Sequence, residues 1–159
     1  MATLPTLDDL QATLIDIFAD FNSGRARPDH GLPWGSILGK WEKAGYRAED
    51  FNRLVDHMVE QSTLMERNGV YLLTEKAVQD GLIELPTNEE VENEVLGCFA
   101  ELKTRAGEGQ MAQVIVPRMQ KHGYTGEEIN RALEALVGKR FVEQRGNMLI
   151  LTEAGFAAM

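Results

Sequence analysis

Cysteine and long apolar runs are scarce in this sequence. A single cysteine, Cys98, occurs in 159 residues, which excludes an internal disulfide and favours a reducing compartment. No apolar run approaches the ~20 residues that a membrane-spanning helix needs, and segment 1–9 lacks the basic and apolar regions of a secretory signal peptide. We therefore expect a cytoplasmic protein that does not enter a membrane.

Residues that build metal and catalytic sites are also few. The three histidines, His30, His57 and His122, are scattered and have no second ligand at metal-binding spacing. There is no glycine-rich phosphate loop and no grouping of acid, base and nucleophile that spacing would support. Cys98 stands beside Phe99 on the apolar side of an expected helix, which is typical of a buried, unreactive thiol. The sequence thus predicts no metal, no cofactor and no enzymatic activity.

Basic residues are outnumbered. The formal net charge is −9, from 25 acidic and 16 basic residues. Segment 1–85 carries 14 acidic and 8 basic residues, whereas segment 86–159 carries 11 and 8. A strongly acidic chain is a poor non-specific binder of polyanions because it repels phosphate. The charge disfavours nucleic acid as a partner, although local basic patches can still form in the second half.

A duplication organises the chain. Segment 45–74 recurs as segment 123–152 at one constant offset, without a gap. The identical positions are Gly45-Tyr46 and Gly123-Tyr124, Asn52-Arg53 and Asn130-Arg131, Val59 and Val137, Arg67 and Arg145, Leu73 and Leu151, and Thr74-Glu75 and Thr152-Glu153. A self-match at a fixed period indicates repeated structural units. We therefore predict two units, 1–85 and 86–159, joined by a linker at 84–89.

Each half opens with an amphipathic helix. Apolar residues at three- and four-residue steps predict these helices at 7–22 and 89–104. In the first copy the helix is followed by segment 22–33, which is rich in turn-forming residues and is expected to be a loop.

A second helix is predicted before the first glycine of the duplicated segment. In the second copy we expect a short strand at 111–116 and then a helix that starts at Pro117, where the missing N–H costs nothing, and ends at Gly123. In the first copy, segment 34–44 corresponds to this region, and its helix is expected to end at Gly45.

The third helix has the clearest start signal. Thr125 and Glu128 predict a capping box, in which a hydroxyl and a carboxylate each accept a free backbone N–H, whereas the first copy has Arg47 at the cap and no box. The side chains expected to face inward are Phe51, Leu54, Val55, Met58 and Val59 in the first copy and Ile129, Leu133, Leu136 and Val137 in the second.

A hairpin follows each third helix. Two apolar runs flank Asn68-Gly69 in the first copy and Gly146-Asn147 in the second, and such pairs favour the backbone angles of a tight turn. Thr74 and Thr152 are then placed to cap a final helix. The predicted class is mainly α with small β-hairpins, an α+β fold.

This order of elements resembles the winged-helix variant of the helix-turn-helix. The closing segments 70–77 and 148–155 resemble the wing and exit helix of multiple-antibiotic-resistance-type and phenolic-acid-type regulators. The resemblance covers almost the whole chain twice and implies two tandem winged-helix units. Winged helices serve DNA recognition, RNA contact and protein assembly alike, so the resemblance alone does not imply one function.

In the DNA-reading members of that family the third helix enters the major groove and the wing touches the backbone. The resemblance therefore assigns Asn52, Arg53, Asn130 and Arg131 to the groove, and Arg67, Arg145 and Asn147 to the wing. Acidic residues crowd these positions, with Glu49, Asp50, Asp56 and Glu60 beside Arg53 in the first copy. The second copy has Glu127, Glu128 and Glu134 beside Arg131. A DNA binder needs several basic phosphate contacts, so the charge argues against this role in both units, and we assign it to the second unit if it occurs.

Two tryptophans, Trp34 and Trp41, lie close enough in the chain to share one helical face. We interpret them as packing residues of the core or between units, and the alternative is a partly exposed pair that anchors a partner. We favour a protein-interaction or assembly module that binds another protein or forms a homodimer. The alternative is a DNA-binding regulator that uses the third helix and wing of the second unit.

Overall fold

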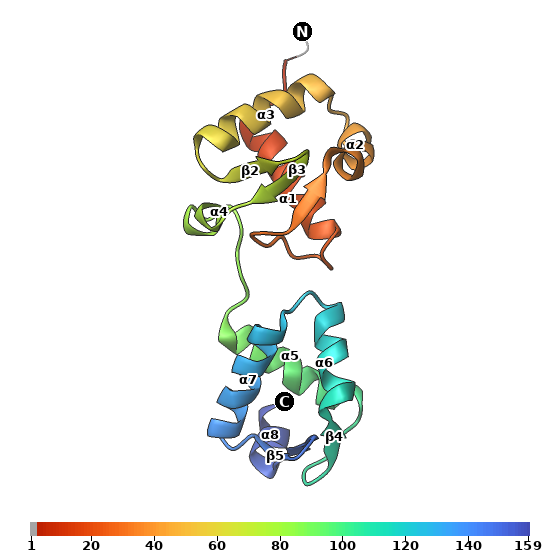
Figure 1. Cartoon of the computed structure of the whole chain (residues 1–159). Coiled ribbons are helices and arrows are strands. Elements are labelled where there is room, and N and C mark those ends of the chain that lie inside the picture. The colour runs from red at the N-terminus through yellow and green to blue at the C-terminus, as the bar shows by residue number, and fades with distance from the viewer. Residues whose placement is uncertain (1–2) are drawn as a thin grey trace. The chain divides into compact units, whose positions relative to one another are not determined.

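The computed structural model describes residues 3–159, and the chain divides into two compact units, 1–85 and 86–159 (Figure 1). Each unit has four helices and one three-stranded antiparallel sheet in its described part. The mixed, mainly helical class with small hairpins is confirmed. None of the helices formed by residues 3–159 is long and apolar enough to span a membrane.

Unit 1, residues 1–85, runs helix, strand, helix, helix, hairpin, helix. Its elements are α1 (Leu7–Asp20), β1 (Gly31–Pro33), α2 (Trp34–Lys43), α3 (Ala48–Glu60), β2 (Leu64–Arg67), β3 (Val70–Leu73) and α4 (Glu75–Gln79). The sheet order is β1-β3-β2, so the hairpin gains a third strand from the segment before α2.

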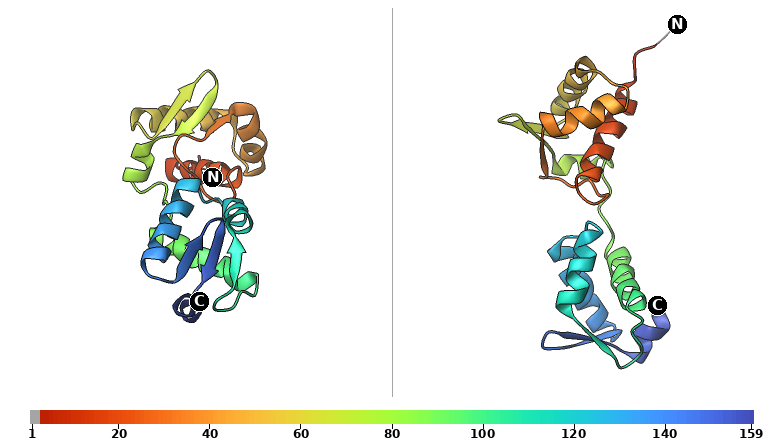
Figure 2. Two further views of the ribbon diagram at one scale, coloured as in Figure 1. Left: turned by 60° about the horizontal axis from the view of Figure 1, so that its bottom comes forward. Right: turned by 90° about the vertical axis from the view of Figure 1, so that its right-hand side faces the viewer.

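Unit 2, residues 86–159, repeats that order. Its elements are α5 (Asn88–Glu101), β4 (Gly109–Met111), α6 (Ala112–Lys121), α7 (Gly126–Gly138), β5 (Val142–Arg145), β6 (Met148–Leu151) and α8 (Glu153–Ala158). Its sheet order is β4-β6-β5, and the strands of each sheet lie side by side in Figure 2. In both sheets the last strand of the hairpin is central.

The two cores correspond position by position. Ile37 and Ile115 are both fully buried, and Trp41 is fully buried where unit 2 has the fully buried Met119. These pairs keep the offset that relates Gly45 to Gly123, so the predicted match between the second helices is confirmed. The second helix of each unit ends before a glycine with a left-handed backbone, Gly45 at φ 89° and Gly123 at φ 86°, as expected for a helix stop.

The predicted strand at 111–116 and helix start at Pro117 are wrong. The strand is β4, and α6 already begins at Ala112, so Pro117 lies inside the helix. Ile115 and Met119, one helical turn apart, are both fully buried, and this helical burial outweighs the strand preference of the β-branched residues around them. The cost is one helical hydrogen bond, because Pro117 has no N–H to donate to the carbonyl of Gln113.

The expected loop at 22–33 also ends in a strand. Gly31 in β1 pairs with Leu72, and Gly109 in β4 pairs with Ile150. A Cβ atom on Gly31 would lie 2.5 Å from a Val70 methyl, and one on Gly109 would lie 2.9 Å from the Met148 methyl. The two glycines occupy the same position of the repeat, and each lets the outer strand approach the hairpin closely.

The helix caps are partly as predicted. Thr125 and Glu128 form the full capping box, with hydrogen bonds of 2.9 and 3.2 Å. No capping box was expected at Arg47, but half of one is present: the Asp50 carboxylate accepts from the Arg47 backbone N–H at 3.0 Å. The reciprocal bond cannot form since an arginine side chain has no acceptor.

Both hairpins turn at the predicted pairs. Asn68 and Gly69 have φ of 52° and 79°, which is typical of a type I′ turn, and Gly146 has φ of 61°, which suits the first position of a type II′ turn. Thr152 caps α8 by accepting from the Gly155 N–H at 3.0 Å. Thr74 stands at the N-cap of α4 but accepts no N–H from that helix, and its hydroxyl donates to the Ser62 carbonyl at 2.6 Å.

Candidate interaction surfaces

The outer faces of α3 and α7 carry the residues that the family resemblance assigns to a DNA groove. Asn52, Asn130 and Arg131 are exposed there, whereas Arg53 is only half exposed. The Arg53 guanidinium donates to the Pro5 carbonyl at 2.5 Å and lies 3.9 Å from the Asp50 carboxylate. Arg53 therefore fastens the segment before α1 to α3, and its guanidinium is already engaged inside unit 1.

Arg131, the counterpart of Arg53, is used differently. It is exposed, and no acid among residues 3–159 lies within ion-pair distance of its guanidinium. The duplicated arginine is thus an intramolecular clamp in unit 1 and a free surface cation in unit 2.

A different contact joins the first and third helices of unit 2. Lys139, at the end of α7, lies 2.7 Å from the carboxylate of Glu92 on α5, and Glu92 is only 5% exposed. The Asn88 side chain donates to the other Glu92 oxygen at 3.1 Å. Lys139 is therefore engaged within the unit.

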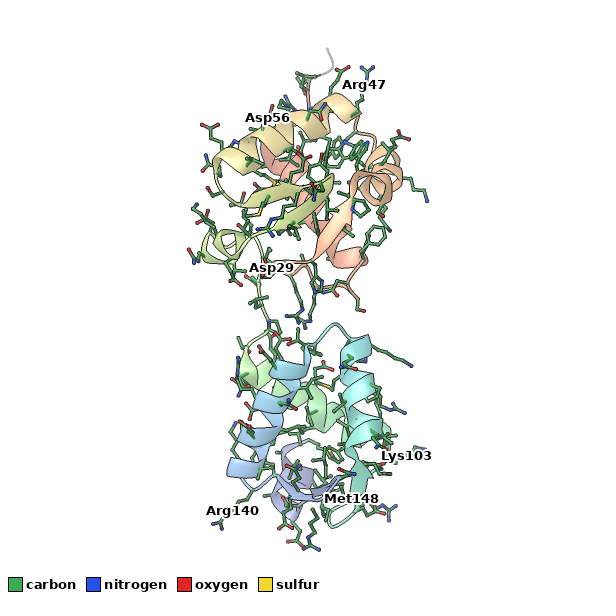
Figure 3. All side chains as sticks on the ribbon, in the orientation of Figure 1. Asp29, Arg47, Asp56, Lys103, Arg140 and Met148 are labelled. Atoms are coloured by element: carbon green, nitrogen blue, oxygen red, sulfur yellow. The ribbon has the colours of Figure 1, made fainter. Side chains whose placement is uncertain are left out.

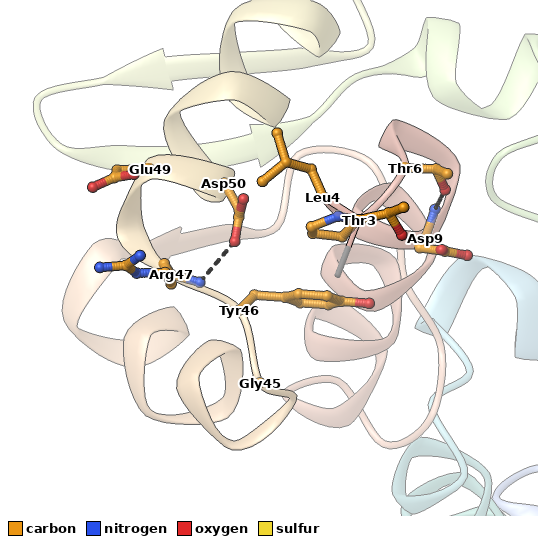
Figure 4. A pocket seen from close by; sticks show the side chains of 10 residues that line it. Thr3, Leu4, Thr6, Asp9, Gly45, Tyr46, Arg47, Glu49 and Asp50 are labelled. Atoms are coloured by element: carbon orange, nitrogen blue, oxygen red, sulfur yellow. Dashed lines mark hydrogen bonds between the residues drawn. The ribbon is translucent and has the colours of Figure 1, made fainter. Parts of the chain in front are cut away.

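A cavity of about 470 Å³ lies beside the Arg53 clamp, between the N-terminal segment and the start of α3 (Figure 4). Its lining residues are Thr3, Leu4, Pro5, Thr6, Asp9, Gly45, Tyr46, Arg47, Glu49 and Asp50. Three of these are acids and one is basic, which makes it a poor place for an anion. Residues 3–159 contain no group of three histidine, cysteine or acidic side chains that could hold a metal ion.

The two hairpins each present one exposed arginine. Arg67 and Arg145 are exposed, and Arg145 lies 3.5 Å from Glu143 with 73% of its side chain accessible. Asn147 is exposed at the turn of the second hairpin. An ion pair this exposed holds Arg145 weakly, so its charge remains available to a partner.

The tryptophans pack within unit 1. Trp41 is fully buried and its indole N–H donates to the Arg47 carbonyl at 2.8 Å. Trp34 is half-buried and stacks on Phe51 with ring centroids 4.3 Å apart. Both tryptophans therefore pack in or against the core of unit 1. Trp41 is not exposed and could not anchor a partner at the surface.

Cys98 is buried as expected, and its sulfur lies 3.6 Å from the Met119 sulfur. Burial first, and then the nearby charges of Glu101 and Glu94, raises the pKa of the thiol above its ordinary value. A thiol kept protonated in this way is a poor nucleophile.

Sequence reasoning missed an apolar component of the surface. Val59 and Val137 were expected to face inward, but they are 46% and 39% exposed. The buried positions of the last helical turn belong to Met58 and Leu136, and one further residue rotates the side chain outward by about 100°. Their presence at the same position of both repeats is the signal that could have identified them.

Comparison of the chain with protein-family models, with curated proteins and with solved structures finds no match.

Proposed function

We propose that this chain is a non-enzymatic tandem winged-helix module that mediates protein–protein interaction or assembly. The supporting observation is the state of its basic residues. Arg53 and Lys139, which DNA binding would draw on, are engaged inside their units. Most acids of the same helices are exposed: Glu49, Asp56 and Glu60 on α3, and Glu127 and Glu134 on α7. Asp56, labelled in Figure 3, is one of these exposed acids on α3.

The arrangement of strands supports the winged-helix assignment. In each unit a third helix leads directly into a hairpin, and a short strand before the second helix pairs with the returning strand of that hairpin. This is the order expected of a winged helix, with the hairpin as the wing, and it occurs twice.

Exposed apolar side chains on these surfaces support a protein partner. Val59 and Met65 are exposed around the α3–β2 connection, and Val137 lies at the matching place in unit 2. Apolar groups surrounded by charged residues are typical of surfaces that bury a partner.

The second candidate is a DNA-binding regulator that acts through unit 2. One observation favours it: Arg131 on α7 and Arg145 on the wing are both exposed, and neither is held by a buried acid. Together with Asn130 and Asn147 they would supply groove and backbone contacts from one unit.

A salt titration with a random-sequence DNA duplex distinguishes the two functions. The interaction module is expected to show no affinity even at low ionic strength. A steep dependence of the affinity on salt, abolished in Arg131→Ala/Arg145→Ala, would contradict it. The matched control is Arg118→Ala, because Arg118 is paired with Glu101 at 3.2 Å and lies on α6, outside the third helix and wing.

A further inference from the structure

Strand β5 has an open edge. It is the outer strand of the sheet β4-β6-β5, and within residues 3–159 it pairs with β6 alone. A groove of about 460 Å³ follows this edge, and all four residues of the strand line it together with Val137 and Arg140 from the end of α7. An open edge beside a groove has the geometry needed to receive an additional strand.

The register identifies the backbone groups that face the groove. Arg145 and Met148 flank the two-residue turn, so they are a hydrogen-bonded pair, and alternation makes Glu143 and Ile150 the next such pair. The N–H and C=O groups of Val142 and Gln144 therefore point away from β6, toward the open edge. These groups would form the ladder to an added strand.

The cations that line the groove favour an acidic occupant. Arg140 is exposed, its side chain points away from the ribbon at the end of α7 (Figure 3), and no acid among residues 3–159 lies within ion-pair distance of it. Its backbone is held at φ 62°, with its N–H bonded to the Val137 carbonyl at 3.0 Å and its carbonyl accepting from Thr152 at 2.6 Å. Arg145 stands at the other end of the strand, and only Glu143 opposes these charges.

The geometry points to strand addition at β5: an extended protein segment with acidic side chains pairs with the outward backbone groups of Val142 and Gln144, between Arg140 and Arg145. The 39% exposed Val137 lines the groove and offers an apolar contact to a side chain on one face of that segment. This inference rests on the proposed function and names the partner's chemistry and the place where it binds.

Unit 1 differs at the same place and provides a natural control. In the register that aligns Gly45 with Gly123, the counterpart of Arg140 is Ser62, and the counterpart of Gln144 is Glu66. Each strand carries one acid, Glu66 in β2 and Glu143 in β5, so the difference is that the edge of β2 lacks the first cation. An acidic segment is expected to select unit 2.

The test uses a fluorescein-labelled peptide of alternating Val and Glu, with an alternating Val and Lys peptide as the charge control, and follows anisotropy with the full chain. Gln144→Pro removes an outward N–H that no β6 residue needs, which an edge strand tolerates, and it is expected to weaken binding about tenfold or more. Glu66→Pro makes the same change in unit 1 and should leave the affinity unchanged. Arg140→Asn removes a charge, suits the left-handed backbone, and should weaken binding about threefold to fivefold.

Hydrogen exchange of the backbone amides tests the mode of binding separately, and it does not require Gln144→Pro to fold. Saturation with the Val and Glu peptide should slow exchange at Val142 and Gln144, while Glu143 and Arg145, already bonded to β6, change little. Failure of the acidic peptide to bind, equal binding to Gln144→Pro, or equal binding of the Val and Lys peptide would each overturn the inference.

Displacement of the peptide by duplex DNA, with a steep salt dependence, would assign the same cations to a nucleic acid and overturn both the inference and the proposed function. Absence of both peptide and DNA binding would overturn only strand addition at β5, and the interaction module would remain.

Discussion

Arg53 and Arg131 show how one residue can take two roles in a duplicated chain. Both occupy the same position of the third helix, and both were assigned to a DNA groove by resemblance alone. The difference between them comes from the Pro5 carbonyl, which lies within reach of Arg53. Because a charged donor on a carbonyl is worth more than a neutral one, this contact contributes to the stability of unit 1.

We expect Arg53→Ala to destabilise unit 1 by about 1–2 kcal/mol, since it removes a charge-assisted hydrogen bond and loosens the segment before α1. Arg131→Ala is the matched control and should change stability by no more than about 0.5 kcal/mol, as for an exposed residue. Both tryptophans lie in unit 1, so tryptophan fluorescence during urea unfolding reports that unit. Equal effects of the two substitutions would contradict the clamp.

At the scale of the elements, both second helices contain a poor helix former at the same position. Pro117 lies in the middle of α6, and Gly39, its counterpart in the first repeat, lies in the middle of α2. Neither helix is specified by local preference, because Pro removes a hydrogen bond and Gly raises the entropy of the unfolded chain. The buried pairs Ile37 and Trp41 in α2, and Ile115 and Met119 in α6, hold these helices in place.

Gly39→Ala should therefore stabilise unit 1 by about 0.5–1 kcal/mol. Gly39 is exposed, and a Cβ atom there would meet no heavy atom within 4 Å. The measurement is the midpoint of urea unfolding followed by tryptophan fluorescence. Gly45→Ala is the contrasting control, since its φ of 89° strains an L side chain and should make the same type of substitution destabilising.

At the scale of the whole molecule, the two units have separate cores of matching composition, but they differ in what joins the first helix to the third. Unit 2 uses the Glu92–Lys139 ion pair, and the equivalent positions of unit 1 are Gln11 and Gln61. The first helices align with Phe18 opposite Phe99, whereas the third helices align in the register of Gly45 and Gly123. The first and third helices align at different offsets because the loop after α1 is longer than the loop after α5. Glu92 is therefore matched with Gln11 by the first offset, and Lys139 with Gln61 by the second.

We expect Lys139→Gln alone to destabilise unit 2 by about 2 kcal/mol, because it leaves a buried carboxylate without its cation. The double variant Glu92→Gln/Lys139→Gln reproduces the residues of unit 1 and should regain most of that loss. Circular dichroism during thermal unfolding follows both units, while tryptophan fluorescence, confined to unit 1, should not move. A double variant less stable than Lys139→Gln would contradict this account.

The sequence by itself determined the turns, the helix stops and one helix cap of this protein, because these features depend on residues close together in the chain. Turn pairs such as Asn68-Gly69, the helix stops Gly45 and Gly123, and the Thr125 cap act through near neighbours, so the sequence predicted them correctly. Apolar periodicity located the first and third helices for the same reason.

The candidate sites needed the tertiary structure. The error at Pro117 arose because the burial of Ile115 and Met119 overrode local preference. Val59 and Val137 were placed inward wrongly because the buried face of the last turn ends at Met58 and Leu136. The engagement of Arg53 with Pro5 and of Lys139 with Glu92, and the open edge of β5 beside Arg140, join residues far apart in the chain or depend on which strands pair. Composition and periodicity report neighbours along the sequence, whereas the availability of a charge or a backbone group depends on what folding brings next to it.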